Sequence, residues 1–132
     1  GTPLEQPLVE LFYKDDKLGD PFVSYEQVLM MKALKNKKEI ELIKEKGLAI
    51  NKALVPFFEK AGVRLIDFKV ELGRCGDFAF VLADEISPDS CRLWEIGTDE
   101  KLDKDRFRRD LGGVKESYEK ILENINRSWG TL

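Results

Sequence analysis

Three charged side chains, Asp67, Lys69 and Glu71, alternate with apolar residues in the segment LIDFKVELG at residues 65–73. Because alternate residues of a β-strand share a face, this spacing predicts a charged face opposite a buried one. Asp84, in the next apolar segment, joins the charged face if the hairpin loop has an even number of residues. Facing carboxylates repel each other unless a cation lies between them, and Mg²⁺ bound to the phosphates of ATP would supply that cation.

Lys69 in the same row could contact a nucleotide phosphate directly. The other interpretation of the row is a surface ladder of ion pairs, each of which contributes about 0–1 kcal/mol. The charge pattern by itself favours the surface ladder, and both interpretations stay open at this point.

The composition restricts the chemistry of any site. The 132 residues include no histidine and two cysteines, Cys75 and Cys91, which do not form a C-x-x-C pair. A Cys/His zinc site, a Ser-His-Asp triad and a Cys-His pair are therefore excluded, and both cysteines are predicted to be reduced thiols. Chemistry must come from carboxylates, lysines, arginines and the backbone, and a bound metal would be an oxygen-liganded ion such as Mg²⁺.

The charge balance and the hydropathy pattern limit the partners. There are 22 basic and 25 acidic residues, and this near-balance argues against a nucleic-acid surface. No apolar run approaches the about 18 residues that a membrane span needs, and no charged-then-apolar leader is present. We therefore expect a cytoplasmic protein without a membrane or nucleic-acid partner.

The order of the expected elements predicts an α+β fold, a single domain over residues 1–132 with an antiparallel sheet and flanking helices. A capping box at Ser24 and Gln27 predicts a helix over residues 25–34, and apolar residues at three- and four-residue steps predict a longer helix over residues 37–61. The other predicted elements are a strand at 6–14, a loop at 14–21, strands at 63–73 and 78–85 joined by a turn at 74–77, a loop at 87–94, a mobile loop at 95–110, and a helix at 114–126 with Tyr118, Ile121, Leu122 and Ile125 inward.

Four blocks of the sequence resemble conserved blocks of the SAICAR synthetase family. LIDFKVELG at residues 65–73 resembles the family signature Asp-x-Lys-x-Glu-Phe-Gly, with Leu72 in place of the phenylalanine. The other blocks are ADEISPDSCRLW at 83–94, DKDRFRRDLGG at 103–113 and PLVELFYKDDKLGDP at 7–21. The blocks occur in the family order and the resemblance covers essentially the whole chain, so it favours the magnesium–nucleotide interpretation over the surface ladder.

The resemblance implies a fold, an activity and partners. Members of the family are purine-pathway ligases that join L-aspartate to carboxyaminoimidazole ribotide (CAIR). ATP phosphorylates the carboxylate of CAIR, and the amine of L-aspartate attacks the acyl phosphate to give SAICAR, ADP and phosphate. The implied fold is the central and C-terminal ATP-grasp-like domain of such an enzyme, with ATP and Mg²⁺ as cofactors and a homo-oligomer as the assembly.

The resemblance also implies roles for the residues of the charged strand. Glu71 and Asp84 correspond to the carboxylates that bind Mg²⁺ and the nucleotide. Lys69 corresponds to the lysine on the nucleotide phosphates and is a candidate catalytic residue. Asp67 is expected to orient its neighbours rather than to touch a ligand.

The resemblance implies substrate contacts outside the charged strand. Arg92 is expected to bind the phosphate of the ribotide, where a guanidinium can form two parallel hydrogen bonds. Lys14 and Asp20 are expected to contact the imidazole ribotide at the edge of the pocket. Lys104 and Arg108 are candidate catalytic cations in a loop that closes over phosphates.

The resemblance begins after the N-terminal lobe that members of the family carry, which holds their glycine-containing nucleotide loop. We therefore expect the isolated chain to have little or no ligase activity. Two alternatives stay open: a non-catalytic fragment or interaction domain with a solvated charged face, and another ATP-grasp-like ligase that joins a different carboxylate and amine.

Overall fold

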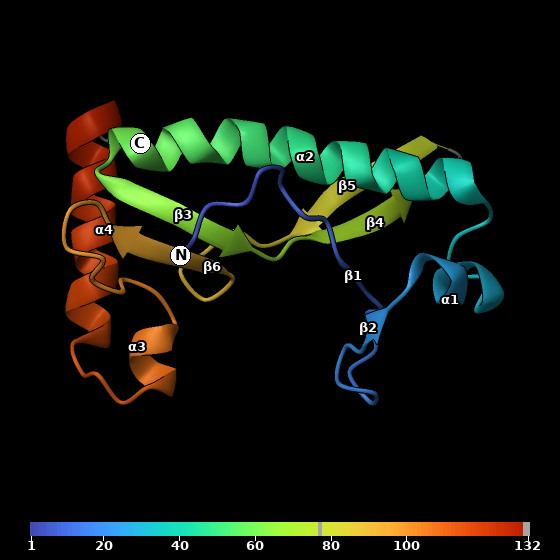
Figure 1. The fold of residues 1–132 in the computed structure, drawn as a ribbon, viewed down its shortest axis with the longest axis horizontal. Coiled ribbons are helices and arrows are strands. Elements are labelled where there is room, and N and C mark those ends of the chain that lie inside the picture. The colour runs from blue at the N-terminus through green and yellow to red at the C-terminus, as the bar shows by residue number, and fades with distance from the viewer. Residues whose placement is uncertain (77, 131–132) are drawn as a thin grey trace. The chain divides into compact units, whose positions relative to one another are not determined.

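The structure, a computed structural model, describes residues 1–76 and 78–130, and the side chains of residues 78 and 79 are outside the description. Its elements in chain order are β1 (Leu11–Phe12), β2 (Phe22–Val23), α1 (Tyr25–Met30), α2 (Lys37–Lys60), β3 (Val63–Phe68), β4 (Glu71–Cys75), β5 (Phe78–Asp84), β6 (Cys91–Glu95), α3 (Asp105–Arg108) and α4 (Val114–Trp129), shown in Figure 1. Short two-stranded sheets and helices make up the chain, so the predicted α+β class is confirmed. No helix in the described ranges is long and apolar enough to cross a bilayer.

The chain divides into two compact units. Unit 1 comprises residues 1–49 and 74–80, and unit 2 comprises residues 50–73 and 81–132. That all 132 residues form one domain stays a prediction.

In unit 1, β1 and β2 pair antiparallel, with Leu11 opposite Val23 and Phe12 opposite Phe22. The strand predicted at residues 6–14 is therefore too long, because β1 and β2 pair over two residues each. In the connecting loop, the carboxylate of Asp15 accepts hydrogen bonds from the backbone N–H groups of the residues two and three positions later, at 2.9 and 3.1 Å. This aspartate stabilises the turn without needing a ligand.

The start of helix α1 follows the predicted capping box. The Ser24 hydroxyl accepts from the Gln27 N–H at 3.2 Å, and the Gln27 side chain accepts from the Ser24 N–H at 2.7 Å. The helix ends at Met30 rather than at residue 34. Lys32 takes a left-handed φ of 58°, which an α-helix cannot accommodate.

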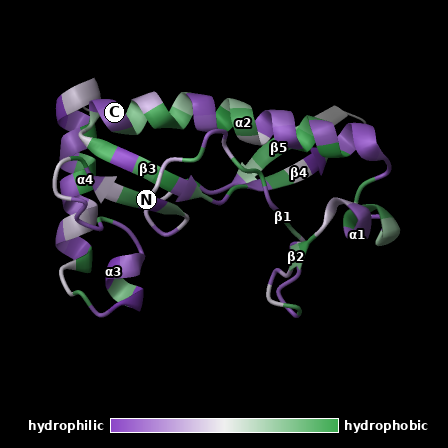
Figure 2. Cartoon of the chain, viewed as in Figure 1, coloured by the Kyte–Doolittle hydropathy of each residue, from purple (hydrophilic) through white to green (hydrophobic). Residues whose placement is uncertain are grey.

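Helix α2 matches its predicted range to within one residue. The Asn36 side chain accepts from the Glu39 N–H at 3.1 Å at its start, and Gly62 with φ 74° follows its end. Pro56 lies inside the helix, which continues to Lys60. Hydrophobic and hydrophilic segments alternate along the helix in Figure 2, as apolar residues at three- and four-residue steps produce.

In unit 2, β3 pairs antiparallel with β6, and their register shifts at a bulge between Leu65 and Asp67. The continuous strand predicted at residues 63–73 is wrong, because the chain leaves this sheet after Phe68 and pairs again as β4 with β5. The prediction of a loop over residues 87–94 is also wrong for its last four residues, because β6 begins at Cys91. The predicted turn at 74–77 lies partly outside the described residues, since residue 77 is not described.

The core of unit 2 draws on α2, the β3–β6 sheet and α4, and its buried members are Phe58, Val63, Cys91, Leu93, Leu102 and Ile121. The prediction that Leu122 of α4 points inward is wrong, because its side chain is 57% exposed. Ser117, which was not predicted to point inward, is buried instead. The loop predicted at 95–110 is interrupted by α3, and its mobility stays a prediction. Leu102 is fully buried, residue 101 bridges to Trp94, and α3 follows.

An ion pair in unit 1 links the first turn of α2 to the end of β4. The two terminal guanidinium nitrogens of Arg74, Nη1 and Nη2, donate to the Glu39 carboxylate at 2.6 and 3.0 Å, and the same guanidinium lies over the Phe80 ring. These hydrogen bonds, together with one from the Lys35 N–H, lower the pKa of Glu39 from 4.5 to about 2. The carboxylate is thus more acidic in the folded than in the unfolded chain.

This shift predicts a pH-dependent contribution to stability. Because the folded pKa of Glu39 is depressed, the contribution is fully present above pH 4.5 and disappears as the pH falls towards about 2. We expect urea unfolding to show wild type more stable than Glu39→Gln above that window, with the difference shrinking inside it. Glu123→Gln on the exposed side of α4 is the matched control. A difference that is constant with pH would contradict this origin.

Candidate functional site

Arg92 on β6 lies between two carboxylates from different elements of unit 2. Its Nη1 donates to Asp67 Oδ2 at 2.6 Å across the sheet, and its Nε donates to Asp105 Oδ2 at 3.0 Å from the start of α3. The hydrogen bond to Asp67 is the main cause that raises the pKa of Arg92, and that to Asp105 adds to it. A guanidinium carries five N–H donors, so this orientation leaves further donors for an anionic ligand. The contact supports the expectation that Asp67 orients its neighbours.

Asp103 and Asp105 position this arginine, and the sequence interpretation missed both. Asp103 is fully buried; its carboxylate accepts from the Leu93 N–H at 2.7 Å and from the Asp105 N–H at 2.8 Å. It thereby ties β6 to the first turn of α3, where Asp105 is 5% exposed. The available signal was an aspartate at a short helix start, which commonly accepts from backbone N–H groups.

Lys69, Glu71 and Asp84 lie around the β4–β5 hairpin. The Lys69 N–H donates to the Ser90 carbonyl at 2.8 Å, and its Nζ lies 3.5 Å from Glu71 Oε1. Glu71 begins β4 and Asp84 ends β5, so the pairing brings them to the same end of the hairpin. The charged row is therefore not one strand face, because the chain breaks between β3 and β4. That the two carboxylates share a face stays a prediction.

The carboxylates of Glu71 and Asp84 would provide only some of the ligands of a metal ion. Within residues 1–76 and 78–130, no three side chains of the metal-binding types His, Cys, Asp or Glu gather around one point. Mg²⁺ is commonly bound by one or two carboxylates, with phosphates and water completing its six oxygen ligands. Glu71 and Asp84 match that number of protein carboxylates, and that they hold Mg²⁺ together with a nucleotide stays a prediction.

Lys14 and Asp20 belong to unit 1, in the loop between β1 and β2. Lys14 Nζ lies 3.6 Å from Asp20 Oδ2 and 2.7 Å from Asp16. Asp20 also accepts from the Asp15 N–H at 2.9 Å and has a left-handed φ of 49°. The structure thus brings these two candidate residues together, whereas all the other candidates belong to unit 2.

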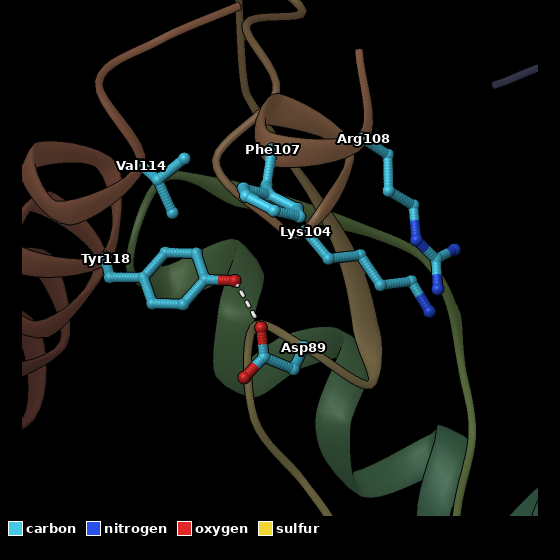
Figure 3. A pocket seen from close by; sticks show the side chains of 6 residues that line it. All are labelled: Asp89, Lys104, Phe107, Arg108, Val114 and Tyr118. Carbon is cyan, nitrogen blue, oxygen red and sulfur yellow. Dashed lines mark hydrogen bonds between the residues drawn. The ribbon is translucent and has the colours of Figure 1, made fainter. Parts of the chain in front are cut away.

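Lys104 and Arg108 line a pocket of about 290 Å³ in unit 2. They are one helical turn apart, and Figure 3 shows both side chains extending in the same direction. The other lining residues are Asp89, Phe107, Val114 and Tyr118. The Tyr118 hydroxyl donates to Asp89 Oδ1 at 2.5 Å, and burial, followed by this hydrogen bond, raises the pKa of Tyr118.

The fold and these charged groups define an α+β protein with candidate sites for anionic small molecules. The SAICAR synthetase family model matches residues 1–125, and the chain belongs to that family.

Named relatives agree with this membership. The chain is 50% identical over 127 residues to the phosphoribosylaminoimidazole-succinocarboxamide synthase of Halalkalibacterium halodurans, covering 96% of this chain and 53% of that protein. It is 54% identical over 125 residues to the synthase of Lysinibacillus sphaericus, covering 95% and 52%. The chain therefore spans about half the length of the curated relatives it matches.

Solved structures agree on the fold. The synthase of Ehrlichia chaffeensis superposes with a TM-score of 0.88 at 44% identity, over 96% of this chain and 54% of that one. A SAICAR synthetase in complex with ADP gives a TM-score of 0.87 at 43% identity, over 94% and 52%.

The buried carboxylate of Asp103 yields a stability prediction. Asp103→Ala leaves two buried backbone N–H groups without an acceptor, so we expect a loss of about 2–4 kcal/mol in the free energy of unfolding. Asp16→Ala, at a side chain that is 89% exposed, is the control and should change it by less than about 0.5 kcal/mol. Equal effects of the two substitutions in urea unfolding would show that Asp103 is not a structural anchor.

Proposed function

We propose that this chain is the central and C-terminal part of an ATP-dependent ligase of purine biosynthesis. The reaction joins L-aspartate to CAIR through an acyl phosphate and gives SAICAR, ADP and phosphate. The observation that carries the proposal is the Lys69–Glu71 pair at the end of the β4–β5 hairpin where β4 begins and β5 ends, at Asp84. A family member solved with ADP supports a nucleotide in this fold, and the family match favours the ligase over a solvated, non-catalytic face.

Charge is the main obstacle in this reaction, because the anionic phosphates of ATP must approach a carboxylate. In the proposal, Glu71 and Asp84 hold Mg²⁺, which supplies positive charge at the phosphates. Lys69 binds a nucleotide phosphate. The hydrogen bond from its backbone N–H to the Ser90 carbonyl fixes the position of its Cα, from which the side chain extends.

The remaining candidates bind the other anionic reactants. Arg92, held by its two aspartates, binds the phosphate of CAIR with its remaining N–H donors. Lys14 and Asp20 contact the imidazole ribotide. Lys104 and Arg108 are catalytic cations that act on the anionic reactants from α3 and the residue before it.

The proposal also concerns the longer enzyme to which this chain would belong. We infer an ATP-grasp-like fold completed by a further nucleotide-binding lobe, since the chain spans about half the length of its relatives. The enzyme would act in the cytoplasm as a homo-oligomer.

Nucleotide binding tests the proposal directly. Isothermal titration of the chain with ATP and excess Mg²⁺ should give a saturable signal that Lys69→Met and Glu71→Gln each weaken about tenfold, because each loses a charged contact. Lys115→Met, at a side chain that is 84% exposed on α4, should bind like wild type. Equal affinities for all four proteins would place the nucleotide elsewhere and reject the assignment.

Turnover tests the need for a further lobe. In a coupled assay with ATP, Mg²⁺, L-aspartate and CAIR, we expect the 132-residue chain to show no turnover above background. The physical reason is that a nucleotide held from one side only does not exclude water or fix the transferred phosphate. A rate near that of the intact Halalkalibacterium halodurans relative would overturn this expectation.

A further inference from the structure

Glu85, the residue that follows β5, holds a backbone conformation that glutamate rarely adopts. Its φ is 78°, in the left-handed region, where the Cβ atom comes close to the following carbonyl oxygen. The other non-glycine residues with a left-handed φ in the described ranges are three aspartates and Lys32. Aspartate tolerates this region, and Lys32 lies just past the end of α1, where a left-handed residue commonly ends a helix. Neither reason applies to Glu85, so its conformation needs another explanation.

The conformation of Glu85 acts on the residue before it. The Glu85 N–H donates to Oδ1 of Asp84 at 2.7 Å, and this hydrogen bond restricts the rotation of the Asp84 side chain. Within the part of the chain that the structure describes, Oδ2 of Asp84 accepts no hydrogen bond. One carboxylate oxygen is therefore held by the backbone, and the other is left for a cation.

The link between β5 and β6 is fixed at its other end by a turn over residues 87–90. The Ser90 hydroxyl accepts from the Ser87 N–H at 3.0 Å, and the Ser87 hydroxyl accepts from the Asp89 N–H at 3.1 Å. Ser90 is 5% exposed, and its carbonyl accepts from the Lys69 N–H at 2.8 Å. Because strand β5 and this closed turn hold the link from both sides, the two residues between them have little freedom. An unfavourable φ persists where the surroundings impose it in this way.

We propose that Glu85 is a positioning residue. Its left-handed backbone directs its N–H at the Asp84 carboxylate and so fixes the orientation in which Asp84 meets a cation. The proposal rests on the proposed function, in which Glu71 and Asp84 hold Mg²⁺ at the nucleotide. A carboxylate that is oriented before binding loses less rotational freedom when the ion binds. The role belongs to the backbone of Glu85 and not to its carboxylate.

Three variants separate the backbone from the charge. Glu85→Gly relieves the unfavourable φ but no longer restricts it, because glycine adopts both signs of φ readily. Glu85→Gln removes the negative charge and keeps the backbone preferences of the native residue. Asp99→Gly is the matched control in the same unit, since it also removes one negative charge and one left-handed residue, at a φ of 56°.

The first measurement is the set of three-bond Hα–Hβ couplings of Asp84, which report its χ1 rotamer by NMR. Wild type, Glu85→Gln and Asp99→Gly should show one rotamer, and Glu85→Gly should show averaged couplings. The second is isothermal titration with ATP and excess Mg²⁺. Glu85→Gly should weaken binding about fivefold, whereas the other two variants should stay within about twofold of wild type. In urea, Glu85→Gly should unfold at the same or a higher midpoint than wild type, because it removes an unfavourable φ.

Four results would each overturn the inference. Asp84 could sample several rotamers in wild type, or Glu85→Gly could leave the affinity unchanged. Equal weakening by Glu85→Gln and Glu85→Gly would make the Glu85 carboxylate itself the contact. A urea midpoint of Glu85→Gly well below that of wild type would assign Glu85 a structural role alone.

The two measurements also separate this inference from the proposed function. One Asp84 rotamer in wild type without a signal from ATP and Mg²⁺ rejects the nucleotide site, and the couplings of the variants then still decide whether Glu85 orients Asp84. Nucleotide binding with a freely rotating Asp84 rejects the role of Glu85 alone.

Discussion

The arrangement of unit 2 depends on the two hydrogen bonds that the buried carboxylate of Asp103 accepts. Taking a carboxylate out of water is unfavourable unless hydrogen bonds replace its hydration, and here two backbone N–H groups do so. One belongs to β6 and the other to the first turn of α3. The same contact therefore fixes a sheet strand, a helix start and, through Asp105, the orientation of Arg92.

Local charge balance separates structural from available cations. Arg74 and Arg106 are engaged by carboxylates or carbonyls within their own units, whereas Lys104 and Arg108 face a pocket. Arg92 combines both roles, since two aspartates hold it while donors remain. The surroundings of each cation, and not the number of cations in a charge-rich sequence, therefore decide which of them can bind an anion.

The helices were predictable to a large extent, and the sheets were not. The capping box of α1 and the apolar stripe of α2 are local signals, and both helices begin where expected. Residues 63–73 alternate continuously, yet β3 and β4 pair with different strands. Alternation reports which residues share a face of an extended chain, but the choice of partner depends on segments far away in sequence.

The sequence by itself determined the family, through ordered blocks that cover most of the chain, and the residue types available for chemistry. It identified Lys69 and Glu71 as neighbours because they are two residues apart. Only the tertiary structure showed that Asp67 and Asp105 hold Arg92, that Asp103 is buried, and that Lys104 and Arg108 share a pocket with Asp89. The reason is that ion pairing and burial depend on distances in space between residues that are remote in the chain.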